Sequence, residues 1–252
     1  MKKFELTAES KINWFGRTLY RIKACIDFTT TSGDEVKAGD LGGYVEKEQN
    51  LSHDGKAWVW GNAEVCGDAK VCGDAEVCGN AKVCGNAKVC GNAEVCGDAK
   101  VCGNAEVCGN AKVWGNAEVW GNAEVWGNAE VCGDASIFST KHIFCVTPIG
   151  QYANSLTVFR TKERKLKISF EFETYEVEEF RKAIHNLWDE KYVDIAESAI
   201  SLAKKHINLT PEIKDCPFCG GKAKFDKDFE IVICTKCGST AKEEIWNDRC
   251  VD

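Results

Sequence analysis

The residues with the clearest chemistry are four cysteines near the end of the chain, Cys216, Cys219, Cys234 and Cys237. They form two Cys-x-x-Cys pairs separated by 14 residues. Two such pairs can supply the four thiolates that a structural Zn²⁺ ion prefers in tetrahedral coordination. We predict a zinc ribbon over residues 213–252, in which metal binding is coupled to folding and all four coordination positions are filled. A redox-active Cys-x-x-Cys pair is the alternative.

A sequence repeat contains further cysteine residues, together with several tryptophans. From Ala57 to Asp134, the hexad Ala-x-Val-Cys/Trp-Gly-Asn/Asp occurs thirteen times without insertion. Four residues of each hexad favour an extended backbone, and Gly-Asn or Gly-Asp favours a turn. An antiparallel meander would mix Ala and Val with Glu and Lys on each face and bury charge. A parallel β-helix over residues 57–140 instead points every Ala and Val inward and the Glu, Lys, Cys and Trp side chains outward.

With eighteen residues per coil, the outward positions form columns. The charged columns are Glu64, Lys82, Lys100 and Glu118; Lys70, Lys88, Glu106 and Glu124; and Trp58, Glu76, Glu94, Lys112 and Glu130. The thiol columns are Cys66, Cys84 and Cys102; Cys72, Cys90 and Cys108; and Cys78 and Cys96. We predict reduced thiols, because hexad spacing is not a metal-ligand spacing and in-register strands need not suit disulfide geometry.

Aromatic residues replace cysteine in three consecutive hexads. Trp114, Trp120 and Trp126 therefore fall on the three faces of one coil, and Phe138 lies one coil beyond Trp120. Exposed apolar groups on an otherwise polar surface mark interaction sites, so these four residues are the predicted interface. The alternative is that the following domain folds back over them.

The flanking segments predict further β-structure and two helices. Residues 1–56 contain strand patterns at 4–6 and 18–24 and are expected to form an N-terminal β cap, because a β-helix exposes unpaired strand edges at its ends. Residues 141–212 predict a β-β-β-α-α domain, with strands at 143–147, 156–160 and 166–172 and helices at about 177–190 and 193–207. The fold class is thus mainly β. On the helices, Glu178, Glu179, His185 and His206 are expected to be solvated rather than catalytic.

The net charge and the N-terminal sequence limit the functions that we expect of this protein. The chain has a net charge of −7, and residues 57–135 carry −6 of it, with 11 acidic side chains and 5 lysines. This argues against strong binding of duplex DNA. The start of the chain lacks the apolar core of a signal peptide, and no stretch is apolar enough to span a membrane. These features favour a cytoplasmic protein.

The hexads resemble the hexapeptide motif of left-handed β-helix proteins, in which three hexads make one triangular coil. The sequence Gly39-Asp40-Leu41-Gly42-Gly43-Tyr44, the Asn50-Leu51-Ser52 step and the following hexads resemble a family of phage and prophage proteins over residues 1 to about 210. This resemblance implies a phage setting and location in the bacterial host cytoplasm, but no particular activity.

The C-terminal cysteines also resemble the zinc ribbons of Lar-type restriction alleviation proteins. The matching residues are the run Cys216-Pro217-Phe218-Cys219-Gly220-Gly221, the later Cys234 to Gly238, and Trp246-Asn247-x-Arg249. The resemblance implies a protein that modulates its host.

These observations predict a non-enzymatic protein that antagonises a bacterial antiviral defence, whether restriction-like or based on nucleotide signalling. It would bind a host defence protein, or would sequester a small nucleotide between the protomers of a homo-oligomer such as a trimer. One alternative is a structural, self-assembling β-helix. The other is a hexapeptide acyltransferase, which needs a histidine base; the hexads contain no histidine, and only His53 and His142 flank them.

Overall fold

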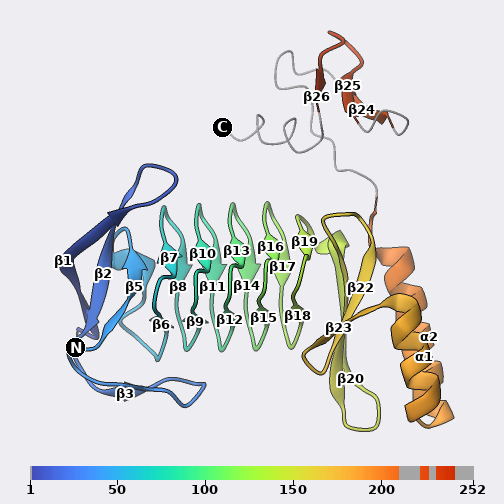
Figure 1. The fold of residues 1–252 in the computed structure, drawn as a ribbon, viewed down its shortest axis with the longest axis horizontal. Coiled ribbons are helices and arrows are strands. Elements are labelled where there is room, and N and C mark those ends of the chain that lie inside the picture. Colours follow the sequence, from blue (N-terminus) through green and yellow to red (C-terminus); the bar gives the residue numbers. More distant parts are fainter. Residues whose placement is uncertain (1, 210–221, 227–230, 242–252) are drawn as a thin grey trace. The chain divides into compact units, whose positions relative to one another are not determined.

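The structure is a computed structural model that describes residues 2–209, 222–226 and 231–241. The chain divides into two compact units, residues 1–208 and residues 209–252. The first unit holds the repeats, an N-terminal segment (residues 2–56) and an α+β segment (residues 143–206). Figure 1 shows the strands of the repeats stacked between these two segments.

The thirteen hexads form a parallel β-solenoid, as predicted. Each hexad contributes one two-residue strand, and strands eighteen residues apart pair in register, so that Lys82 pairs with Glu64 and with Lys100. The strands are β6 (Trp58–Val59), β7 (Glu64–Val65), β8 (Lys70–Val71), β9 (Glu76–Val77), β10 (Lys82–Val83), β11 (Lys88–Val89), β12 (Glu94–Val95), β13 (Lys100–Val101), β14 (Glu106–Val107), β15 (Lys112–Val113), β16 (Glu118–Val119), β17 (Glu124–Val125) and β18 (Glu130–Val131).

Three sheets form the faces of the solenoid, and two segments outside the hexads lengthen one of them. That sheet has the order β1-β2-β5-β7-β10-β13-β16-β19, where β5 (Leu41–Val45) and β19 (Ser136–Ile137) pair in parallel with hexad strands. The other two are β17-β14-β11-β8 and β18-β15-β12-β9-β6. The stack therefore has about five turns, slightly more than the hexads alone predict.

The interior consists of the Ala and Val side chains, which are at most 1% exposed in every hexad. This confirms the predicted orientation, since the side chains before and after each Val point outward. The turns add a second ladder that the hexad pattern did not suggest. Asn86 Nδ2 donates to Asn104 Oδ1 at 2.9 Å, and Asn104 Nδ2 donates to Asn122 Oδ1 at 3.0 Å. Asn92, Asn110 and Asn128 form an equivalent ladder.

The N-terminal segment continues the solenoid sheet and covers part of its first coils. It contains β1 (Phe4–Ile12), β2 (Thr18–Ala24), a hairpin of β3 (Phe28–Thr29) and β4 (Glu35–Val36), β5, and the short helix η1 (Glu48–Asn50). Lys3 Nζ donates to the carbonyl oxygens of Gly55 and Ala57, at 3.2 and 2.8 Å. Asn50 Nδ2 donates to Gly67 O and Ala69 O. Both side chains therefore satisfy backbone acceptors at the start of the solenoid.

This segment also overturns one expectation. Trp58 occupies an outward position but is fully buried, because Phe28 of β3 packs edge-on against it with ring centroids 5.5 Å apart. Glu76, one coil further in the same column, is 6% exposed and accepts hydrogen bonds from Ser32 and Trp60. Outward position therefore does not guarantee exposure near this end.

The α+β segment has four strands rather than the predicted three. Strands β20 (Ile143–Ile149), β21 (Asn154–Arg160), β22 (Leu166–Phe170) and β23 (Glu173–Glu176) form an antiparallel sheet in chain order, against which α1 (Val177–Leu187) and α2 (Glu190–His206) pack. Strand β23 was missed because its sequence, Glu-Thr-Tyr-Glu, has no apolar alternation. The helix η2 (Thr140–His142) joins this segment to β19.

Strand β21 contacts the last coil of the solenoid. Ala135 forms an antiparallel bridge with Thr161, and the Glu130 N–H donates to Thr157 Oγ1 at 2.9 Å. In the second unit, β24 (Ala223–Asp226), β25 (Ile231–Cys234) and β26 (Thr240–Ala241) form a three-stranded antiparallel sheet.

Candidate functional site

The four aromatic residues that were predicted to form an interface lie on the coils where the repeat predicts them. Trp114, Trp120 and Trp126 directly follow β15, β16 and β17, which belong to three different sheets, so one Trp lies on each face of the solenoid. Phe138 follows β19, which pairs with β16, and it therefore lies one coil beyond Trp120. The four residues do not share the same surroundings.

Trp114 and Trp120 are partly covered. The Trp114 ring lies 6.0 Å from that of Phe172, between centroids, and Lys112 Nζ lies 5.3 Å from the Phe172 centroid. The predicted alternative, a following domain that folds back, thus applies to Trp114. Trp120 is half-buried, and its Nε1 has no hydrogen-bond partner among the described residues.

Trp126 and Phe138 are the more exposed of the four residues, and they lie on different faces of the solenoid. Trp126 is 52% exposed and Phe138 is 39% exposed. The Phe138 ring lies edge-on to His142, with centroids 6.2 Å apart. An exposed indole supplies a large apolar contact area with a hydrogen-bond donor at one edge.

The outward cysteines differ from the prediction of reduced thiols. Disulfides join Cys78 to Cys96, Cys84 to Cys102 and Cys90 to Cys108, each across a sequence separation of 18. The Cα atoms of each pair are 4.6 to 4.7 Å apart, within the range that a disulfide spans. The prediction failed because stacking in register brings equivalent side chains of neighbouring coils to the strand spacing. Cys66 and Cys72 remain unpaired at the start of their columns.

Two of the four predicted zinc ligands, Cys234 and Cys237, lie among the described residues. Cys234 ends β25 and is buried, and its Sγ accepts N–H groups of Lys236 and Cys237, each at 3.3 Å. Such bonds stabilise negative charge on sulfur and suit a thiolate ligand. Cys216 and Cys219 lie outside the described residues. The donor set of the described pair therefore fits zinc, while the full site stays a prediction.

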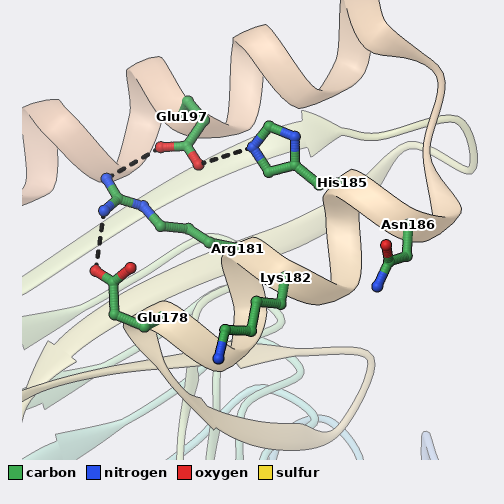
Figure 2. A pocket seen from close by; sticks show the side chains of 6 residues that line it. All are labelled: Glu178, Arg181, Lys182, His185, Asn186 and Glu197. Atoms are coloured by element: carbon green, nitrogen blue, oxygen red, sulfur yellow. Dashed lines mark hydrogen bonds and ion pairs between the residues drawn. The ribbon is translucent and has the colours of Figure 1, made fainter.

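The α1 and α2 helices border a shallow depression lined by Glu178, Arg181, Lys182, His185, Asn186 and Glu197. Figure 2 shows that Glu197 of α2 faces Arg181 and His185 of α1. Its carboxylate lies 3.0 Å from Arg181 Nη2 and 3.5 Å from His185 Nε2, and Glu178 lies 2.9 Å from Arg181 Nη1. The Glu197–Arg181 ion pair ties α2 to α1, and the Glu178–Arg181 ion pair lies within α1. Glu178, Glu179, His185 and His206 are exposed, as predicted.

The two histidines that flank the solenoid have structural contacts. His53 stacks on Phe4 with ring centroids 4.4 Å apart, and its Nδ1 accepts the Lys3 N–H at 3.2 Å. His142 is fully buried, and its Nδ1 accepts the Phe138 N–H at 3.1 Å. In each ring, one nitrogen is therefore occupied by a backbone donor.

One exposed apolar cluster was missed. Ile12, Trp14 and Phe15, at the turn between β1 and β2, are 74%, 90% and 63% exposed. The sequence could have predicted this exposure, because apolar residues next to a turn at Gly16 are too far from any core to be buried.

Comparisons with known proteins do not assign the chain to a class. No protein-family model matches it, and a search of curated proteins found no match. Among the described residues, no helix is long and apolar enough to cross a membrane.

Proposed function

We propose that this protein is a non-enzymatic binding protein of a phage or prophage that antagonises a bacterial antiviral defence. The observation that supports it is the exposed indole of Trp126 near the end of the hexads. Trp126 is 52% exposed, whereas Trp58 is buried and Trp60, Trp114 and Trp120, the other tryptophans at outward hexad positions, are only partly exposed. Exposed tryptophan is characteristic of contact hot spots. The phage setting rests on the sequence resemblance.

Two modes of action suit such a surface. The solenoid can occlude a host defence protein, or two or more protomers of a homo-oligomer can enclose a small nucleotide signal. In this proposal the solenoid is left-handed, residues 1–56 and the α+β segment act as end caps, and the second unit is held by structural zinc. The protein would act in the bacterial host cytoplasm.

The contacts of the flanking histidines favour binding over acyl transfer. A general base needs a ring nitrogen that can reach a substrate proton. His142 is fully buried and His53 is stacked on Phe4, and each uses Nδ1 to accept a backbone N–H. Likewise, the contacts of β5 and Thr161 with the terminal coils disfavour end-to-end assembly of solenoids.

The test compares Trp126→Ser with the control Trp14→Ser, which removes another exposed indole at the β1–β2 turn. Immobilised wild type and variants are incubated with bacterial extract, and retained proteins and nucleotides are identified by mass spectrometry. Loss of a hot-spot indole should lower retention of the partner by roughly 30-fold or more. The Trp14 variant should retain it. Equal retention by wild type and Trp126→Ser would remove the support for this surface.

A further inference from the structure

Two of the three thiol columns hold one more cysteine than a disulfide needs. In one, Cys72 precedes the Cys90–Cys108 disulfide, and in another, Cys66 precedes the Cys84–Cys102 disulfide. The third column has only the Cys78–Cys96 disulfide, because tryptophan occupies the positions before and after it. A column of three equivalent sulfurs can hold one disulfide in two places.

Cys72 stands in the same relation to Cys90 as Cys90 does to Cys108. The Cys72 N–H donates to Val89 O at 3.0 Å, and the Cys90 N–H donates to Val107 O at 2.9 Å. Parallel pairing of β8, β11 and β14 keeps the three coils in one register. The Cα atoms of Cys90 and Cys108 are 4.7 Å apart, so Cys72 approaches Cys90 at the same spacing, from the side opposite Cys108.

We propose that the column of Cys72, Cys90 and Cys108 is a thiol–disulfide exchange site. The Cys72 thiol gives its proton to solvent, and the thiolate attacks Cys90 Sγ. The bond between Cys72 and Cys90 forms while the bond between Cys90 and Cys108 breaks. The electron pair leaves on Cys108 Sγ, which takes a proton from solvent. One thiol and one disulfide exist before and after, so the rearrangement uses no oxidant or reductant.

The site would also react with small external disulfides such as oxidised glutathione. The thiolate of Cys72 or Cys108 attacks one glutathione sulfur, forms a mixed disulfide and releases the other glutathione as a thiolate. Both cysteines are half-buried and so accessible at the ends of the column. The Cys108 N–H donates to Val125 O, which places Cys108 one coil before Trp126. The exchange site does not depend on the proposed function.

The column of Cys66, Cys84 and Cys102 serves as a natural comparison, because both of its ends are closed. Cys66 is 4% exposed and Cys102 is 5% exposed. Cys66 packs against Leu19 and Tyr44, and Asn13 Nδ2 donates to its Sγ at 3.5 Å. Burial raises the pKa of the Cys66 thiol, which lowers its thiolate fraction. This column should therefore resist external disulfides.

The experiment maps the unpaired sulfur in the full chain. Protein equilibrated in a reduced and oxidised glutathione buffer is labelled with a light maleimide, then denatured, reduced and labelled with a heavy one. Tandem mass spectrometry of tryptic peptides assigns each cysteine. In wild type, the light label should divide between Cys72 and Cys108 at a ratio within about tenfold of unity, since the two isomers have equivalent geometry. Cys78 and Cys96 should carry only heavy label.

A variant traps the second isomer. In Cys108→Ser, the disulfide should move to Cys72 and Cys90, so that both carry heavy label, whereas Cys72→Ser should keep the Cys90–Cys108 bond. Serine is close in size to cysteine, and an unchanged β signal in circular dichroism confirms the fold. Light label on both Cys72 and Cys90 in Cys108→Ser would overturn the proposal. So would light label confined to Cys72 in wild type, or a light-labelled Cys78–Cys96 pair in the same buffer.

Discussion

The closeness of successive coils can be tested by adding one methyl group to a turn glycine. Gly91 has φ of +68°, and a Cβ there would lie 2.9 Å from both the N and O atoms of Gly109 in the next coil. Gly127 has φ of +70°, but a Cβ there meets no described atom within 4 Å. Gly91→Ala and Gly127→Ala thus share the backbone strain and the effect on the unfolded chain, and differ only in the contact with the next coil.

The structure gives the expected magnitude. Left-handed backbone costs an alanine about 1–2 kcal/mol, which applies to both variants. In Gly91→Ala, the coils must separate by about 0.5 Å to bring the contact from 2.9 Å to an ordinary 3.4 Å. The Asn92 N–H to Gly109 O bond, now 2.7 Å, would lengthen with them. Overpacking of this kind costs about 1–3 kcal/mol, and a weakened hydrogen bond costs about 1 kcal/mol more.

Gly91→Ala should therefore lower the free energy of unfolding by about 2–4 kcal/mol more than Gly127→Ala. The assay is urea denaturation of the full chain, monitored by the β signal in circular dichroism. The dependence of the unfolding free energy on urea concentration should be the same for both variants, which confirms that the same surface area is exposed on unfolding. Equal destabilisation by the two substitutions would refute the described stacking, because it would mean that a Cβ at residue 91 does not clash with Gly109 of the next coil.

Three further predictions concern single groups. Burial lowers the pKa of Lys3 from 10.5 to about 8. Between these two pH values the unfolded chain therefore holds a proton that the folded chain has lost, and stability rises with pH. The free energy of unfolding of wild type, relative to that of Lys3→Met, should rise by about 2–3 kcal/mol from pH 7 to 10. Asn104→Asp should cost about 1–2 kcal/mol in urea denaturation, because aspartate cannot donate to Asn122, whereas Asn122→Asp still accepts from Asn104 and should cost less. Elemental analysis should find about one zinc per chain, lost when Cys216 and Cys219 are both changed to Ser.

Each of these three predictions has an outcome that would contradict it. A difference between wild type and Lys3→Met that is flat with pH would mean that Lys3 keeps its proton on folding. Equal costs for the two asparagine substitutions would show that charge, and not the lost donor, dominates. Freshly purified reduced protein without zinc would contradict the ribbon.

The solenoid could be predicted from sequence because its information is local and repeated. Alternation within Ala-x-Val fixes which side chains point inward, and the hexad length fixes which residues stack. The predicted columns match the observed register, as for Glu94 between Glu76 and Lys112. The rung at β19 lies within the predicted residues 57–140, but the rung at β5 could not be predicted, because it pairs with β7 without sharing the hexad sequence.

The surroundings of the site depend on segments distant in sequence, which the repeat does not encode. Trp58 is buried by Phe28, and Trp114 contacts Phe172 while Trp126 does not. All three tryptophans occupy outward positions of the hexads, Trp58 at the second position and the other two at the fourth. The disulfides were missed for a different reason, since whether stacked thiols pair depends on the coil spacing and not on the order of residues.

Native mass spectrometry of the protein purified from a bacterial host tests the central proposal most directly. The intact assembly is weighed first and then denatured to identify anything it retained. We predict a zinc-loaded oligomer that carries a nucleotide or a host protein, and loss of that partner in Trp126→Ser. A zinc-loaded species with nothing bound, and unchanged by Trp126→Ser, would contradict the binding function.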